Sequence, residues 1–219
     1  MSLTLHFHPL ASFCWKVLIA LYENDTPFEP VIVDLGEERS RAAFLKLWPM
    51  GKMPVLVDAA RDRTVPESTI IVDYLAAHYP GASELIPADP ELARQTRLAD
   101  RFYDFYVHEP MQKIVVDTLR PAGRNDPFGV EQARATLATA YGMIDDDMRS
   151  KNWAVGDAFT LADCAAFPAL YYANKVARFP SQYPNLAGYF ERLARRPSVL
   201  RVAKEAEPYF AMFPYREEA

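Results

Sequence analysis

The chain has 219 residues, half of them hydrophobic, and carries a formal net charge of −5 at neutral pH. This length suits one large domain or two small ones, and the apolar content excludes wholesale disorder. The negative balance argues against a protein that binds nucleic acid through clustered basic residues, and against a polybasic membrane anchor.

The N-terminus and the cysteines indicate a protein of a reducing compartment. The first residues, MSLTLHFH, have no basic region followed by a long apolar run, so we expect no signal peptide. No apolar run approaches the roughly 20 residues of a membrane-spanning helix. Cys14 and Cys164 are far apart and have no metal-ligand spacing. We therefore expect a cytoplasmic protein with no membrane partner and no metal site.

The first third of the chain has the pattern of a mixed α/β domain. The alternation over residues 3–8 predicts a short strand, and apolar residues at helical spacing over about 12–23 predict a helix. Residues 28–34 read as a second strand, so the two strands should pair in parallel with a right-handed crossover.

A short helix then leads to Trp48-Pro49, and two strand patterns at 53–58 and 64–65 indicate an antiparallel hairpin. Another helix is expected to begin at Pro66-Glu67-Ser68. The resulting order, βαβ-α-ββα, is typical of a thioredoxin-like domain, which we place at residues 1–81.

The rest of the chain is helical in pattern. Residues 82–90 contain two prolines and read as a linker. We predict an all-helical C-terminal domain over 91–219, with helices at about 91–119, 127–149, 160–176, 185–194 and 197–205.

The turn from the first strand into the first helix holds two candidate catalytic residues, Ser12 and Cys14. A helix N-terminus presents unpaired N–H groups and the positive end of the helix dipole, so a thiolate bound there is stabilised. A hydroxyl or thiol at this place can donate a hydrogen bond to that thiolate. The alternative is structural: Ser12 caps the helix and Cys14 is a small buried residue.

A second motif, Gly51-Lys52-Met53-Pro54-Val55, places a proline directly before a strand. Pro54 is therefore a candidate for a cis peptide bond. With a cis bond, the backbone N–H and C=O of Met53 would face outward and could bind a short peptide as a neighbouring strand does. The alternative is that Pro54 only begins the strand.

A third motif, Pro66-Glu67-Ser68, suits the end of an α-amino acid. Glu67 can pair with an ammonium group, while Ser68 and the nearby helix N–H groups can hold a carboxylate. Ordinary helix capping is the alternative. A fourth motif, Thr160 with Asp163, has the spacing of a capping box and is a folding signal.

In this order and over nearly the whole chain, these motifs resemble those of the cytosolic glutathione transferase family. The resemblance implies a thioredoxin-like domain, a helical domain, glutathione as cosubstrate without a metal, and often a homodimer. It implies that Lys52 pairs with the glycyl carboxylate of glutathione. Met53, Pro54 and Val55 would contact its backbone, and Glu67 and Ser68 would bind its γ-glutamyl end.

The resemblance also locates the catalytic position. The serine of related classes would fall on Ala11, which has no hydrogen-bond donor in its side chain. Ser12, the next residue, is therefore our first candidate for stabilising the thiolate, and Cys14 is the second.

The second substrate should lie between the two domains. The aromatic stretch 101–108 suits an apolar electrophile, with Phe105 in the wall and Arg101 or His108 as polar groups. Its alternative is a core helix. The aromatic segment 208–215 has no predicted place.

The sequence thus predicts transfer of glutathione to a small, mostly apolar electrophile. Two alternatives remain: a thiol transferase that forms a mixed disulfide through Cys14, and a binding module without activity, which Ala11 favours. The isomerase reaction of zeta-like relatives is a weaker option.

Overall fold

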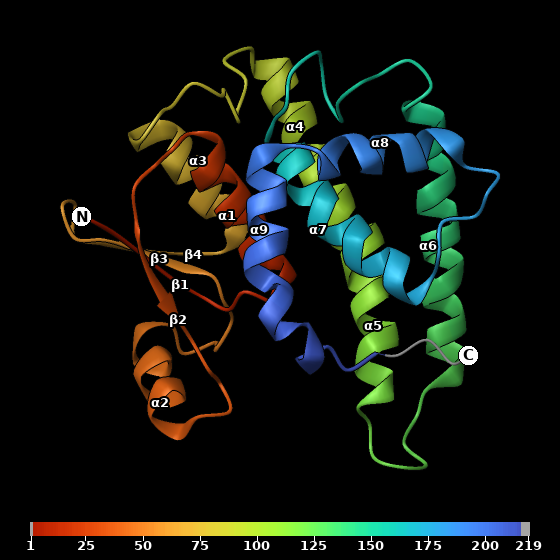
Figure 1. Cartoon of the computed structure of the whole chain (residues 1–219), viewed down its shortest axis with the longest axis horizontal. Helices are drawn as coiled ribbons and strands as arrows, with labels where there is room; N and C mark the ends of the chain where they lie inside the picture. The colour runs from red at the N-terminus through yellow and green to blue at the C-terminus, as the bar shows by residue number, and fades with distance from the viewer. Residues whose placement is uncertain (1, 216–219) are drawn as a thin grey trace.

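The computed structural model describes residues 2–215, and its N-terminal part is built on a four-stranded sheet (Figure 1). The strands β1 (Leu3–Phe7), β2 (Glu29–Ile32), β3 (Val55–Asp58) and β4 (Arg63–Pro66) lie in the order β2-β1-β3-β4. β1 and β2 are parallel, and the helix α1 (Ser12–Glu23) connects them. β3 is antiparallel to both β1 and β4. The predicted βαβ unit and hairpin are confirmed.

Helices cover both faces of the sheet, and the alternation of β1 places its three apolar side chains on the more deeply buried face. Its apolar side chains join one core with α1 and with α3 (Ser68–His78). On the other face lies α2 (Glu38–Leu47), whose Phe44 packs against Val33 and Val55. This is the predicted thioredoxin-like arrangement.

The C-terminal part is helical. The helix α4 (Pro90–Phe102) continues through the π-helical segment η1 (Tyr103–His108) into α5 (Glu109–Thr118). The remaining helices are α6 (Pro127–Asp147), α7 (Leu161–Val176), α8 (Pro184–Ala194), α9 (Pro197–Ala206) and the 3-10 helix η2 (Glu207–Met212). Within residues 90–215 there is no strand, and the predicted helices agree with these bounds to within two residues at each end.

The central helix α7 is fixed at its start by the predicted capping box. Thr160 is the N-cap, its N–H donates to Asp163 Oδ2 at 2.9 Å, and its hydroxyl accepts from the N–H of Ala162. Asp163 also accepts from the Tyr189 hydroxyl at 2.7 Å. These bonds satisfy N–H groups that a buried helix start would otherwise leave unpaired.

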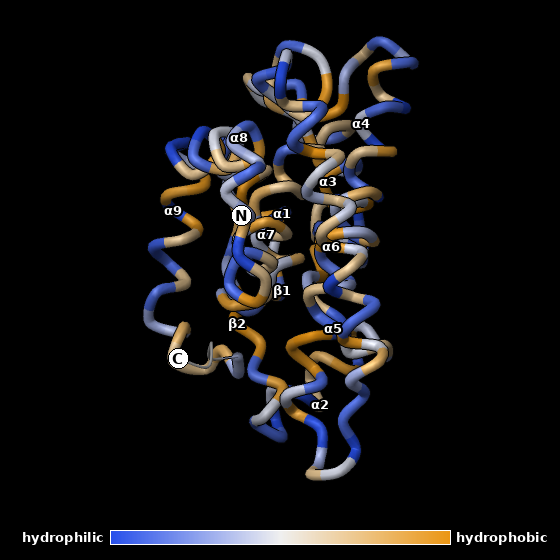
Figure 2. The backbone as a smooth tube through the Cα atoms, turned by 90° about the vertical axis from the view of Figure 1, so that its right-hand side faces the viewer, coloured by the Kyte–Doolittle hydropathy of each residue, from blue (hydrophilic) through white to orange (hydrophobic). Residues whose placement is uncertain are grey.

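The two parts meet where α1 packs against α7. Trp15 of α1 stacks on Phe167 of α7 and donates from its indole N–H to the Pro9 carbonyl at 2.6 Å. Tyr172 of α7 donates to the Leu10 carbonyl at 2.7 Å. The helical part therefore holds the loop that leads into α1. Figure 2 shows hydrophilic residues in the outer loops of the molecule.

No helix formed by the described residues is both long and apolar enough to cross a membrane. The segment between α3 and α4 has no helix or strand. The domain limits at 81 and 91 stay a prediction.

Candidate functional site

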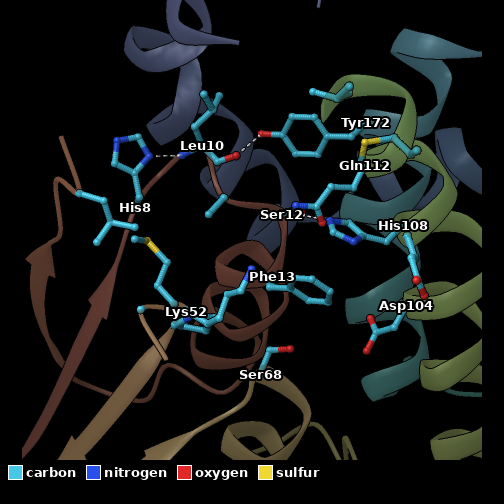
Figure 3. Close-up of a pocket in the computed structure, with 18 of the residues that line it drawn as sticks. His8, Leu10, Ser12, Phe13, Lys52, Ser68, Asp104, His108, Gln112 and Tyr172 are labelled. Atoms are coloured by element: carbon cyan, nitrogen blue, oxygen red, sulfur yellow. Dashed lines mark hydrogen bonds between the residues drawn. The ribbon is translucent and has the colours of Figure 1, made fainter. Parts of the chain in front are cut away.

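A cleft of about 920 Å³ lies between the sheet and the helices, at the end of the sheet where β1 runs into α1. Several parts of the chain line it: the loop into α1, residues 33–35 after β2, the loop before β3, the start of α3, one face of η1 and α5 with Arg101 before them, and Tyr172 of α7. The C-terminal segment completes the wall. Figure 3 shows side chains from both parts of the protein facing this space.

Ser12 is the first residue of α1 and lines the cleft. The N-cap is Ala11, which makes no side-chain cap, so Ser12 is not the capping residue of the structural alternative. Its hydroxyl is instead hydrogen-bonded to Nε2 of His108 from η1 (Figure 3). The first N–H groups of a helix have no acceptor within the helix, so an anion at this point meets both those N–H groups and the Ser12 hydroxyl.

His108 is in the predicted wall of the cleft and also contacts the start of α1. It lines the cleft but is only 6% exposed, and it contacts Ser12 and the ring of Phe13. Burial, and next the positive charge of Lys16, lower the pKa of His108 to about 4. The imidazole is therefore neutral at pH 7, with a proton on one nitrogen only. Its hydrogen bond in the structure is to Ser12, and a role toward the second substrate stays a prediction.

Cys14 does not fit the prediction of a reactive thiol. Its side chain is fully buried and does not line the cleft. Burial raises its pKa to about 12, although a backbone hydrogen bond from His8 acts in the other direction. A thiol in this state is not a nucleophile at neutral pH, so the structural alternative describes Cys14.

Of the four residues predicted to bind glutathione in the motif before β3, three line the cleft. Lys52 is exposed there, and the Met53–Pro54 peptide bond is cis. Met53 and Pro54 line the cleft beside it. Val55 does not: its side chain is buried against α2, and its backbone belongs to the β3 ladder.

Glu67 and Ser68 lie at the start of α3 and line the same cleft. Glu67 has a positive φ of 69°, which is uncommon for a residue with a side chain and is found where surrounding structure or function demands it. Its side chain makes no cap bond. Within residues 2–215 neither side chain has a hydrogen-bond or ion-pair partner, so both are free to bind a ligand.

Arg101 lies next to this motif, at the edge of a buried ion cluster that the sequence analysis missed. Lys16 of α1 is 2.7 Å from Asp100 Oδ1 and from Asp104 Oδ1. Arg101 pairs with Asp100 at 2.9 Å and donates to Thr69 of α3. The signal was present: a lysine on the apolar face of a helix, and two aspartates at i, i+4 spacing. Arg101 thus lines the cleft with its charge paired, and its guanidinium lies 5.5 Å from the centre of the Phe105 ring.

The wall opposite the sheet includes aromatic and aliphatic side chains. Phe105 lines the cleft and is 51% exposed, as predicted for a second-substrate residue. The unplaced segment 208–215 folds back onto α7: Phe210 packs on Tyr171, and Phe213 packs on Tyr172. Met212, Phe213 and Pro214 thereby close one side of the cleft.

No group of His, Cys, Asp or Glu in the described part of the chain has an arrangement that could hold a metal ion.

Comparisons with known proteins agree with this architecture. Residues 5–83 match the family model described as glutathione S-transferase, N-terminal domain, and residues 107–197 match the model described as glutathione S-transferase, C-terminal domain. Glutathione S-transferase GstB of Escherichia coli K12 is 29% identical over 194 residues, which cover 85% of this chain and 90% of that protein.

Solved structures are similar over nearly the whole length. A glutathione S-transferase from Methylobacillus flagellatus KT, solved with glutathione bound, is 26% identical with a TM-score of 0.83, and the match covers 92% of this chain and 98% of that one. The glutathione transferase URE2P8 from Phanerochaete chrysosporium, solved with oxidized glutathione, has a TM-score of 0.85 at 21% identity, covering 96% and 97%. The second likeness shows the fold alone.

Proposed function

Because the chain belongs to the glutathione S-transferase family, we propose that it transfers the thiolate of glutathione to a small, mostly apolar electrophile. The observation that carries the proposal is the convergence of three sequence motifs on one cleft. The start of α1 with Ser12, the loop at Met53–Pro54 and the unpartnered pair Glu67–Ser68 all line it.

Glutathione would lie along the sheet side of this cleft. Its γ-glutamyl ammonium would meet Glu67, and its α-carboxylate would meet Ser68 and the first N–H groups of α3. Lys52 would pair with the glycyl carboxylate. This placement brings the sulfur to the start of α1. The glutathione bound in the structure from Methylobacillus flagellatus, which shares the fold, supports the choice of ligand.

Ser12 would stabilise the thiolate by donating a hydrogen bond from its hydroxyl to the sulfur. This is possible only if Nε2 of the neutral His108 carries the imidazole proton and donates to Ser12 Oγ, because the other tautomer would accept the serine proton instead. The thiol proton leaves to solvent, the sulfur attacks the electrophilic carbon, and a carbon–sulfur bond forms as the leaving group departs with its electron pair.

Calorimetry with glutathione, together with the pH dependence of the ultraviolet absorbance of the bound thiolate, tests the proposal. We expect binding, with a thiol pKa well below the ordinary value of about 8.5. Binding with an unshifted pKa would favour the module without activity. No binding would contradict the transferase and favour a protein-interaction module with the same fold.

The rival based on Cys14 loses its premise, since that thiol is buried. The isomerase option of zeta-like relatives has no support from the site either. Ala11 occupies the expected serine position, and Ser12 is the hydroxyl that the fold presents.

We also propose a homodimer, which the family resemblance implies. Ile70 of α3 and Leu98 of α4 are 55% and 62% exposed, and these two helices are joined by the Arg97–Asp73 ion pair at 2.6 Å. Light scattering should give twice the chain mass, and Leu98→Glu should give the monomer. A wild-type monomer would contradict the proposal. The cytoplasmic location stays a prediction.

A further inference from the structure

The helical wall of the cleft carries a short polar stripe. Glu109 and Gln112 of α5 both line the cleft, are exposed, and lie three residues apart on the same helix face. Phe105 precedes Glu109 by four residues and lines the cleft as well. The polar pair is therefore presented to the same space as the aromatic wall.

Neither side chain of this pair makes a hydrogen bond or an ion pair with another residue of the described chain. Among residues 2–215, Glu109 has no ion-pair or hydrogen-bond partner for its carboxylate, and Gln112 has none for its amide. Every other acidic group of the cleft that lies on the helical side is neutralised: Asp104 pairs with Lys16 and Arg101. Glu109 is thus the unbalanced charge of this wall.

The cations nearest along the chain are engaged elsewhere. Arg101 is held by Asp100 and Asp104, and Lys113, four residues after Glu109, pairs with Asp126 at 3.2 Å. Lys52 lines the cleft from the loop before β3, on the sheet side, where we place glutathione. The helical wall therefore offers an electrophile no free positive charge.

We infer that this wall selects the second substrate by charge: it favours electrophiles with an apolar, aromatic body and a positively charged or hydrogen-bond-donating group, and it disfavours anionic ones. Glu109 is the specificity-determining residue. Phe105, Tyr172 and Phe213 would contact the aromatic body near the sulfur, while Glu109 and Gln112 would bind the donor group. This inference rests on the proposed function.

The test uses two electrophiles that react in the same way. One is para-chloro-meta-nitrobenzoate, an anion, and the other is its amide with ethylenediamine, a cation. In both, the thiolate sulfur bonds to the chlorinated ring carbon and chloride leaves with the electron pair of the broken bond. The kcat/KM of each is divided by its uncatalysed rate constant with glutathione, which removes the difference in intrinsic reactivity.

The wild type should prefer the cation. Glu109→Gln should narrow the cation-to-anion ratio about tenfold, as expected for a unit charge acting over several ångströms at a protein surface, and Glu109→Lys should reverse the preference. Glu131→Gln is the matched control: Glu131 is an exposed glutamate on α6, outside the cleft, so the same loss of charge should leave the ratio unchanged.

Binding of the two glutathione conjugates by calorimetry provides a second readout that needs no turnover. If the wild type binds the cationic conjugate more tightly and Glu109→Gln removes the difference, the inference stands even when transferase activity is absent. Equal ratios in wild type and Glu109→Gln would overturn the inference and leave the proposed function intact. Failure to bind either conjugate would overturn both.

Discussion

Ser12→Ala should raise the pKa of the thiol of bound glutathione. The Ser12 hydroxyl lies at the start of α1, and its hydrogen bond to His108 orients it. A hydrogen bond to a charged acceptor contributes about 1.5–3 kcal/mol, which corresponds to a shift of about 1–2 pKa units. At a pH below the wild-type pKa of the bound thiol, the thiolate fraction, and with it the rate, should fall about 10- to 100-fold, and raising the pH above the new pKa should restore it.

The assay is a titration of thiolate absorbance in the complex, combined with a pH–rate profile for one electrophile. Ser12→Thr is the control, because it keeps the hydroxyl. His108→Phe should produce a smaller shift in the same direction, since Ser12 keeps its proton but loses its orienting donor. An unchanged thiol pKa in Ser12→Ala, with glutathione still bound, would refute the role of Ser12 and leave the helix N-terminus as the stabilising group.

Three further outcomes are expected. Glu67→Gln should weaken glutathione binding about tenfold in calorimetry, because a neutral amide replaces the partner of the ammonium group; unchanged affinity would place the γ-glutamyl end elsewhere. Burial tends to raise the pKa of Glu23, but hydrogen bonds from Arg196 and Ser198 outweigh it and hold that pKa below its usual value. Glu23→Gln should therefore lower the free energy of unfolding in urea by about 1–3 kcal/mol at pH 7. This difference should begin to shrink near the unfolded pKa of about 4.3 and be lost as the pH falls through the lowered pKa of the folded state. The same change at the exposed Glu91 should have no measurable effect. Lys16→Met leaves two buried aspartates without their main partner and should cost about 3–5 kcal/mol in the same assay; a loss below about 1 kcal/mol would contradict the burial argument.

Much of the fold could be predicted because its signals are local. The alternation of β1 and the apolar stripe of α1 depend only on neighbouring residues, and the capping box at Thr160 spans four positions. The linear order of the motifs then indicated the thioredoxin-like domain and the family. Five of the predicted glutathione-binding residues line the cleft because each lies at the end of a predicted element, near the point where β1 meets α1. They are Lys52, Met53, Pro54, Glu67 and Ser68.

The chemistry of the catalytic position depended on contacts that no local pattern contains. Ser12 and His108 are separated by 96 positions in the chain, and only the packing of η1 against the start of α1 joins them. The apolar stripe of α1 already included Cys14, but only the docking of α7 on that face shows that the thiol is sealed from the cleft.

The sequence by itself determined where helices and strands form and which family the chain resembles, because these depend on residue spacing and motif order. Only the tertiary structure decided which charges are balanced and which are free. Asp100 and Thr69 hold the charge of Arg101, whose role toward the second substrate stays a prediction, whereas no residue within 2–215 pairs with the carboxylate of Glu109. Electrostatic balance is a property of distances in space, and the chain sets those distances only when it folds.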